Sequence, residues 1–436
     1  MSLHDKFLKV VKNLYLKNAH VIDPASKTDR VKDLWVEDSK FVHTKAEKID
    51  IEYEILDLTG KTILPGLVDL RCHVRNAVGG NQENIRSVSQ AACAGGFTTL
   101  LVMPNISPFA DNPGSIRYIN ECASKNAAVN FYLAGALTDN MEGRSLSPIG
   151  SLKESGVLAI TDCPLSTQNN EIFVKGVEYA SMFDLPVIDL PRELSLSKNG
   201  SAHDSVVALS MGLGGYPRMA EEIFVQRSIT VSKYLDAHIH LSSISSKGSV
   251  ELINDAKNKG IKITADTTPH HLCLTDEKIR GYHTYFKTHP PLREEEDRES
   301  LVSALLDGTI DNICTGHEPH QDHLKKTEYD LAPAGVTSLD TCFSAIYTQL
   351  FGKVENLPYK LAEWLSYNPS KIIKSNNTNI QLGSSADFIV IDLNEEWIYS
   401  APNSLSLSSN NPFDGCKLRS MIERTYVGGE LVYKKP

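Results

Sequence analysis

The stretch "TILPGLVDLRCHVRN" (62–76) decides the fold of this chain. Its first part is a run of branched apolar residues, which predicts a buried strand at 66–72. The run ends in polar residues and places His73 between Arg71 and Arg75. In a parallel barrel the loops converge at the carboxyl ends of the strands, so polar residues at this point predict a functional site.

Seven further apolar runs alternate with stretches of helical period, such as 83–94, 173–183 and 249–260. The predicted strands are 97–103, 131–136, 156–161, 186–190, 237–242, 261–266 and 310–315. Eight strand–helix alternations over about 250 residues predict an α/β fold, a (β/α)8 TIM barrel. The alternative is a doubly wound open sheet, which would need a glycine fingerprint after its first strand. "GLGGYP" (212–217) follows no predicted strand and is a weak match.

The two ends of the chain have a different pattern from the middle. Residues 13–60 and 382–436 hold short β-rich runs and turn-forming glycines, and neither end is long enough to make a good core alone. We therefore expect both ends to pair into one small composite β-sandwich. The predicted domains are 1–60 and 381–436 for the sandwich and 61–380 for the barrel.

Composition excludes several classes of partner. The 436 residues carry a net charge of −10, which argues against nucleic acid or an anionic membrane surface. No apolar run approaches the roughly 20 residues of a membrane helix. The eight cysteines form no C-x-x-C pair. Free thiols of this kind indicate a reducing, cytoplasmic location.

Six motifs, in order along the chain, resemble those of dihydroorotase, of the cyclic amidohydrolase group. They are "ILPGLVDLRCHVR", "AGGFTTLLVMPN", "ITADTTPHHLCLTDEKI", "HPPLREEEDRESL", "DGTIDNICTGHEPH" and "GSSADFIVID". The resemblance implies a barrel that binds one or two zinc ions, which activate a water and polarise a ring amide. It also implies a carboxylate after the last strand that transfers the proton, and a place in pyrimidine biosynthesis.

The resemblance places three metal ligands and three departures on this chain. The family's His-x-His reads Arg71-Cys72-His73, its strand-5 histidine falls on Leu190, and its catalytic aspartate falls on Gly316. The remaining ligand positions are His73, Asp162 and His240. Three alternatives follow. A single zinc ion could be held by this remnant set, or the mouth could be an ordinary polar site in which His73 and His240 are hydrogen-bonded. In the third, Arg71 takes the place of a cation and pairs with Asp162. Asp189, next to Leu190, is expected to point away because side chains alternate along a strand.

The substrate side of the family pattern is better kept. Arg75, Asn105 and His320 match residues that imply binding of a dihydroorotate-like carboxylate, for which arginine offers paired donors. His289 replaces a family asparagine, and "RNAVGG" (75–80) departs from the family sequence.

A histidine cluster in "HEPHQDH" (317–323) offers a further candidate site. His317, His320 and His323 would form a zinc-binding face in a helix, but Pro319 and the loop context favour a solvated loop.

Taken together, the residues favour a dihydroorotase-like protein that has lost catalysis. By resemblance its partner is aspartate transcarbamoylase, in a complex with several copies of each chain, and the chain itself is expected to be a homo-oligomer. The loops at the barrel mouth and the segment 191–217 are the expected contact surfaces. The alternative is an active, zinc-dependent dihydroorotase or related cyclic amidohydrolase with a rearranged metal site.

Overall fold

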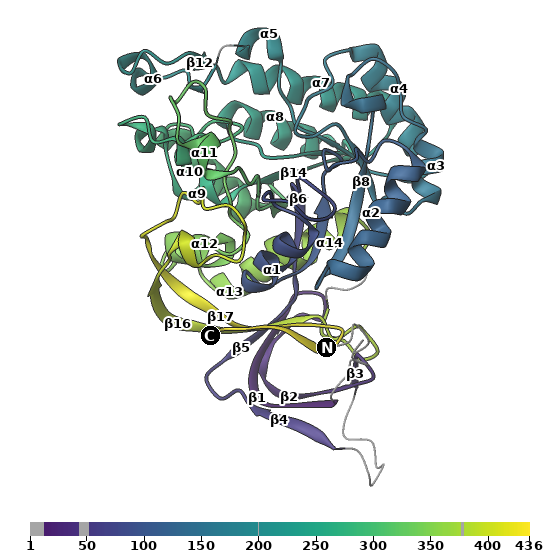
Figure 1. Ribbon diagram of the computed structural model, residues 1–436, viewed down its shortest axis with the longest axis vertical. Coiled ribbons are helices and arrows are strands. Elements are labelled where there is room, and N and C mark those ends of the chain that lie inside the picture. Colours follow the sequence, from purple (N-terminus) through teal and green to yellow (C-terminus); the bar gives the residue numbers. More distant parts are fainter. Residues whose placement is uncertain (1–12, 43–51, 199, 376–378) are drawn as a thin grey trace.

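The computed structural model describes residues 13–42, 52–198, 200–375 and 379–436. They form a helix-wrapped barrel and, beside it, a sheet built from both ends of the chain (Figure 1). The barrel strands are all parallel and follow the chain order around the barrel. They are β6 (Leu67–Cys72), β7 (Phe97–Val102), β8 (Asn130–Ala136), β9 (Ala159–Thr161), β10 (Val187–Asp189), β13 (Ile239–Leu241), β14 (Ile263–Thr267) and β15 (Asn312–Ile313). All eight predicted strands are confirmed, and so is the barrel.

The barrel closes through single contacts between its first and last strands. Cys72, at the end of β6, forms an isolated parallel bridge with His317 beyond β15. The next residue, His73, donates its backbone N–H to the His317 carbonyl at 2.9 Å. This closure brings the polar end of the 62–76 stretch beside the "HEPHQDH" loop.

Helices cover the outside of the barrel between successive strands. The helices that follow strands β6 to β14 are α1 (Ile85–Ala94), α2 (Pro113–Asn126), α3 (Ile149–Glu154), α4 (Asn170–Ser181), α7 (Met219–Leu235), α8 (Lys247–Asn258) and α10 (Glu295–Asp307). After β15 the chain continues through α12 (Cys342–Leu350), α13 (Leu357–Ala362) and α14 (Asn368–Ile372). None of the helices in the described ranges is long and apolar enough to cross a membrane.

Strands from both ends of the chain share one mixed sheet, in the order β18-β17-β16-β5-β1-β2-β3, with β4 also paired to β1. Their bounds are β1 (Asn13–Asp23), β2 (Thr28–Glu37), β3 (Lys40–Val42), β4 (Tyr53–Asp57), β5 (Thr62–Pro65), β16 (Phe388–Ile398), β17 (Lys417–Val427) and β18 (Glu430–Lys434). The predicted pairing of the two ends is confirmed. The two ends are joined where β5 pairs with β16 in antiparallel orientation. The strand that leads into the barrel is therefore hydrogen-bonded to the first of the C-terminal strands.

Smaller elements lie over the mouth side of the barrel. The segment predicted as a contact surface contains α5 (Leu194–Ser197), β11 (Ala202–His203), α6 (Val206–Ser210) and β12 (Gly215–Tyr216), at the far end from the mixed sheet (Figure 1). Further short helices are α9 (Pro269–Cys273) and α11 (Asp322–Lys325). All eight cysteines are free thiols, as predicted.

The barrel has an apolar interior. Val68 and Leu70 of β6 belong to a buried cluster with residues from β7 to β10, which includes Cys163 and Leu190 near the mouth. A larger cluster fills the layer between strands and helices. The interior below the mouth is therefore packed, and chemistry is confined to the mouth itself.

Candidate functional site

The candidate site is the barrel mouth, where the eight strands end and their loops meet. Because all strands run in one direction, residues just past their carboxyl ends come together. His73 follows β6, Asn105 follows β7, Asp162 follows β9 and His320 follows β15, while His240 lies within β13. The structure thus gathers the predicted residues at one end of the barrel.

Arg71 lies buried in the mouth, with 1% of its surface exposed. Its guanidinium donates through Nη1 to Ser243 Oγ at 2.5 Å, and through both Nη atoms to the His289 carbonyl at 3.3 Å. The nearest acidic group is Glu318, whose Oε2 lies 3.8 Å from Nη2. The predicted pair between Arg71 and Asp162 is wrong, because Asp162 has other partners.

Asp162 is held by a loop outside the barrel interior. Its carboxylate accepts the backbone N–H of Thr138 at 3.0 Å, the Thr138 hydroxyl at 2.7 Å and the Thr167 hydroxyl at 3.0 Å. Neighbouring residues of an extended chain point to opposite sides, and it is Cys163 that faces inward. The Cys163 Sγ lies 4.0 Å from His73 Nε2.

The two remaining histidines are each engaged by neighbours. His73 Nδ1 lies 2.9 Å from Asn105 Oδ1. His240 uses both ring nitrogens, Nδ1 with the Thr264 hydroxyl at 2.9 Å and Nε2 with Asp266 Oδ2 at 2.8 Å. Sequence reasoning missed Asp266, although it stands at the polar end of the predicted strand 261–266.

The strand-5 position carries no ligand. Leu190 belongs to the apolar cluster inside the barrel. Asp189 points away from that cluster, as strand alternation predicts, and its carboxylate accepts from Arg227 at 3.0 Å and Ser228 at 2.6 Å on α7.

Gly316 provides no side chain at the family's base position, and little space is free there. Its φ is +60°, and an added Cβ would lie 3.0 Å from Thr268 Cγ2 and 3.1 Å from His270 Cε1. A carboxylate at this residue would therefore meet both strain and crowding.

Glu318 is the acidic side chain that faces the two arginines of the mouth. Its Oε1 lies 3.6 Å from Arg75 Nη2, opposite its contact with Arg71. Burial alone would raise the pKa of Glu318. At the low pH where Glu318 titrates, however, the charges of protonated His73, Arg75 and Arg71 outweigh burial and hold that pKa at about 2. The sequence placed Glu318 in the "HEPHQDH" cluster, yet its pairing with arginines 247 and 243 positions earlier had no local signal.

The predicted substrate-binding residues are divided between two contacts. Arg75 and His320 touch, with Arg75 Nη2 at 3.2 Å from His320 Nε2, and Arg75 Nε donates to the Pro319 carbonyl at 3.0 Å. Asn105 is bonded to His73 instead. Their role in binding a carboxylate substrate stays a prediction.

The "HEPHQDH" segment is not a histidine-bearing helix face. Helix α11 begins only at Asp322. His317 is buried, and its Nδ1 accepts the backbone N–H of Ser338 at 3.2 Å. The segment closes the barrel and carries Glu318 into the mouth.

The mouth residues do not fit the zinc ion that the family resemblance implies. A catalytic zinc needs about three converging protein donors, whereas Arg71 brings a permanent positive charge. Burial raises the pKa of the Cys163 thiol to about 11, so it stays protonated, and zinc binds the thiolate. In the described ranges, two sets of His, Cys, Asp or Glu side chains converge closely enough to hold a metal. They are His203 with Glu294 and Asp297, and Asp392 with Glu395 and Glu423. Neither set contains a residue at the predicted ligand positions of the mouth.

Removal of divalent metal should therefore leave the fold unchanged. We expect dialysis against EDTA to leave the apparent Tm where it is, because the mouth residues do not form a zinc site that would add binding energy to the native state. Differential scanning fluorimetry before and after dialysis measures this, with zinc-saturated EDTA as the control. Elemental analysis giving close to one zinc per chain, with a lower Tm after EDTA, would contradict it.

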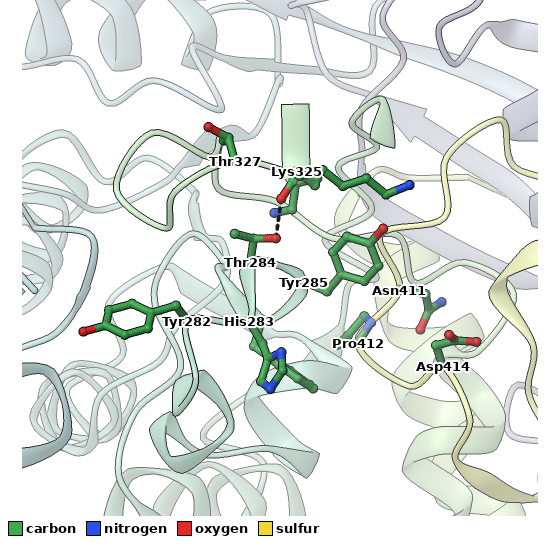
Figure 2. A pocket seen from close by; sticks show the side chains of 11 residues that line it. Tyr282, His283, Thr284, Tyr285, Lys325, Thr327, Asn411, Pro412 and Asp414 are labelled. Carbon is green, nitrogen blue, oxygen red and sulfur yellow. Dashed lines mark hydrogen bonds between the residues drawn. The ribbon is translucent and has the colours of Figure 1, made fainter. Parts of the chain in front are cut away.

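A separate cavity of about 410 Å³ lies away from the predicted ligands (Figure 2). It is bounded by the loop 282–286, by the end of α11 and by residues 411–414. The Thr284 hydroxyl donates to the Lys325 carbonyl at 2.5 Å and joins two of these walls. A second cavity lies beside Arg75 and His320 and is much smaller, about 30 Å³.

Comparison with known proteins gives the same family as the motifs. The model of the "Dihydro-orotase-like" family matches residues 60–249. The dihydroorotase of Acetivibrio thermocellus is 37% identical over 425 residues, which cover 97% of this chain and 99% of that protein. The dihydroorotase of Elusimicrobium minutum is 38% identical over 416 residues, covering 95% and 96%.

Solved structures share the fold at lower identity. L-hydantoinase (dihydropyrimidinase) from Arthrobacter aurescens superposes with a TM-score of 0.85 at 21% identity, covering 97% of this chain and 96% of that one. Dihydropyrimidinase from Brevibacillus agri gives a TM-score of 0.82 at 19% identity, covering 97% and 95%. On the strength of its full-length similarity to the curated relatives, the chain belongs to the dihydroorotase family.

Proposed function

We propose that this chain is a non-catalytic dihydroorotase-family protein of pyrimidine biosynthesis that acts as a structural partner of aspartate transcarbamoylase. One observation carries the first half of the proposal: the guanidinium of Arg71 lies buried in the mouth, among residues that do not converge into a zinc site. Hydrolysis of a cyclic amide in this family needs an activated water and a group that transfers protons.

Two titratable groups of the mouth, Glu318 and His73, are poorly suited to proton transfer near pH 7. Glu318 has a pKa of about 2 and stays ionised. Burial lowers the pKa of His73 to about 4, so its ring stays neutral. An effective general base has a pKa near the working pH, and Gly316 offers none at the position where the family carries its aspartate.

The second half of the proposal concerns the surface. On the segment 191–217, α5 and α6 expose large apolar side chains: Leu194 (38% exposed), Leu196 (40%), Val206 (77%) and Leu209 (80%). Exposed apolar groups gathered in one region are typical of protein–protein contact surfaces. They support a protein partner; the choice of aspartate transcarbamoylase rests on the family resemblance.

Co-expression with the aspartate transcarbamoylase of the same organism tests the partnership. We expect the two chains to elute together from a sizing column, with a mass by light scattering that requires several copies of each. The double variant Leu209→Ser and Val206→Ser should weaken the complex, while Tyr234→Ser, at an 82% exposed position on α7, serves as the matched control. Separate elution at micromolar concentration, with transcarbamoylase activity unchanged by this chain, would refute the partnership.

A second candidate function is an active dihydroorotase or related cyclic amidohydrolase with a rearranged site. The observation in its favour is that the curated relatives at 35–39% identity carry the name dihydroorotase. Zinc-dependent turnover of dihydroorotate that His73→Ala abolishes would establish this candidate and exclude the non-catalytic one.

A further inference from the structure

We propose that Glu318 is the bound anion of the barrel mouth: its side chain fills a carboxylate-binding site formed by Arg71 and Arg75. A free small carboxylate should take its place when the side chain is shortened. The inference rests on the proposed non-catalytic function, because a mouth filled by its own carboxylate does not bind a substrate carboxylate there. It assigns to the Glu318→Ala variant a binding site for acetate-sized anions, which Glu318 itself occupies in the native chain.

The charges of the mouth are unbalanced around this site. Arg71 and Arg75 approach the carboxylate from two sides, at 3.8 and 3.6 Å. Among the described residues, Glu318 is the only acidic side chain within 4.0 Å of either guanidinium. One buried carboxylate thus serves two arginines, and its removal leaves both without a counter-charge.

Both guanidiniums also have N–H groups without a hydrogen-bond acceptor. Arg71 Nε is buried and has no hydrogen-bond partner. Burial is the main influence that lowers the pKa of His320 to about 4, so its neutral ring carries a single N–H. His320 Nε2 lies 2.8 Å from the Ala334 carbonyl, which requires that N–H. Arg75 Nη2, which lies 3.2 Å from the same nitrogen, therefore lacks an acceptor there.

Glu318 neutralises the arginines without bonding to them closely. Charge-assisted hydrogen bonds measure about 2.7–2.9 Å, shorter than both contacts here. The backbone explains the gap, since the Glu318 N–H donates to the Val336 carbonyl at 2.7 Å and the next residue's carbonyl accepts from Arg75 Nε at 3.0 Å. A free carboxylate has no such tether and can approach to full bonding distance.

The mouth has the space that such an ion needs. Truncation of Glu318 to alanine removes Cγ and the carboxyl group, which together have the size and charge of an acetate ion. Gly335 preserves this space, because a Cβ there would lie 2.8 Å from both Glu318 Cγ and His320 Nε2. Arg75 can be reached from solvent, because its side chain is 24% exposed and lines a small cavity.

Chemical rescue of Glu318→Ala by acetate tests the inference. The apparent Tm of wild type, Glu318→Ala and Glu318→Gln is measured in about 100 mM sodium acetate and in sodium chloride of equal ionic strength and pH. We expect Glu318→Ala to melt lower than wild type in chloride and to recover roughly 3 °C in acetate, as for a ligand that binds the native state near millimolar affinity. Wild type should melt alike in both salts.

Glu318→Gln is the matched control, because it lacks the charge but still fills the space. It should melt lower than wild type and gain nothing from acetate. Glu318→Ala combined with Arg75→Ala should lose the acetate effect. Equal Tm values of Glu318→Ala in the two salts would overturn the inference. It would also be overturned if Glu318→Ala were unfolded in both acetate and chloride. These outcomes are independent of turnover: zinc-dependent activity of wild type refutes the proposed function, whereas absent rescue refutes only the internal anion.

Discussion

Arg71→Ala should lower the free energy of unfolding by about 3–5 kcal/mol, the range for removal of one partner from a buried charge pair. The side chain is 1% exposed, so its loss leaves a cavity, and Glu318 keeps only Arg75 as a counter-charge. The Ser243 hydroxyl and the His289 carbonyl also lose their donor. Urea unfolding followed by intrinsic fluorescence measures the change.

Two further variants separate the causes. Arg71→Met keeps most of the buried volume without the charge, so a loss of similar size would assign the effect to charge and hydrogen bonding rather than to packing. Arg144→Ala removes the same group from an 84% exposed site, 3.5 Å from Glu142, and should change stability by less than about 0.5 kcal/mol. An Arg71→Ala protein as stable as Arg144→Ala would show that the buried guanidinium contributes nothing.

Turnover of dihydroorotate by the wild-type protein should be absent even with added zinc. Loss of a general acid–base group alone typically costs about 10²–10⁴-fold in rate, and without a metal-bound water the nucleophile is missing too. From an ordinary kcat near 10 s⁻¹, the expected rate falls below about 10⁻³ s⁻¹. Ring opening and ring closure are both assayed, with the Acetivibrio thermocellus dihydroorotase, prepared identically, as the positive control.

A trace rate in such an assay needs its own control, because a host dihydroorotase can contaminate the sample. His73→Ala purified in parallel decides the matter. A rate shared by wild type and His73→Ala comes from the contaminant. A rate of ordinary enzyme size that only wild type shows would mean that the mouth assembles a competent site in solution.

The fold was predictable because its signals are local. Each barrel strand is a short run of branched apolar residues bounded by helical period, and the parallel order follows from that alternation. The pairing of the chain ends was also predictable, since neither could bury a core alone. The extent of β5 was less so: Thr62–Pro65 belongs to the mixed sheet although it directly precedes a barrel strand.

The site could be predicted only where strand register and residue spacing determine the direction of a side chain. Alternation correctly turned Asp189 away from the interior, where Arg227 binds it. Beyond the neighbouring strand β9, alternation makes Cys163 the inward residue, and Asp162 bonds to Thr138 instead. A shift of one residue reverses the direction of a side chain. The contact of Arg71 with Glu318 joins residues far apart in sequence, so only the closed barrel reveals it.

The shared sheet sets the order in which this protein can become complete during synthesis. Strand β5 leaves the ribosome early, yet its partner β16 begins about 320 residues later. At translation rates of about 5–20 residues per second, the free edge of β5 waits roughly 15–60 s for that partner. An unpaired edge is a template for pairing with other chains. Until its last fifty residues arrive, the nascent chain therefore exposes the β5 edge that β16 later covers.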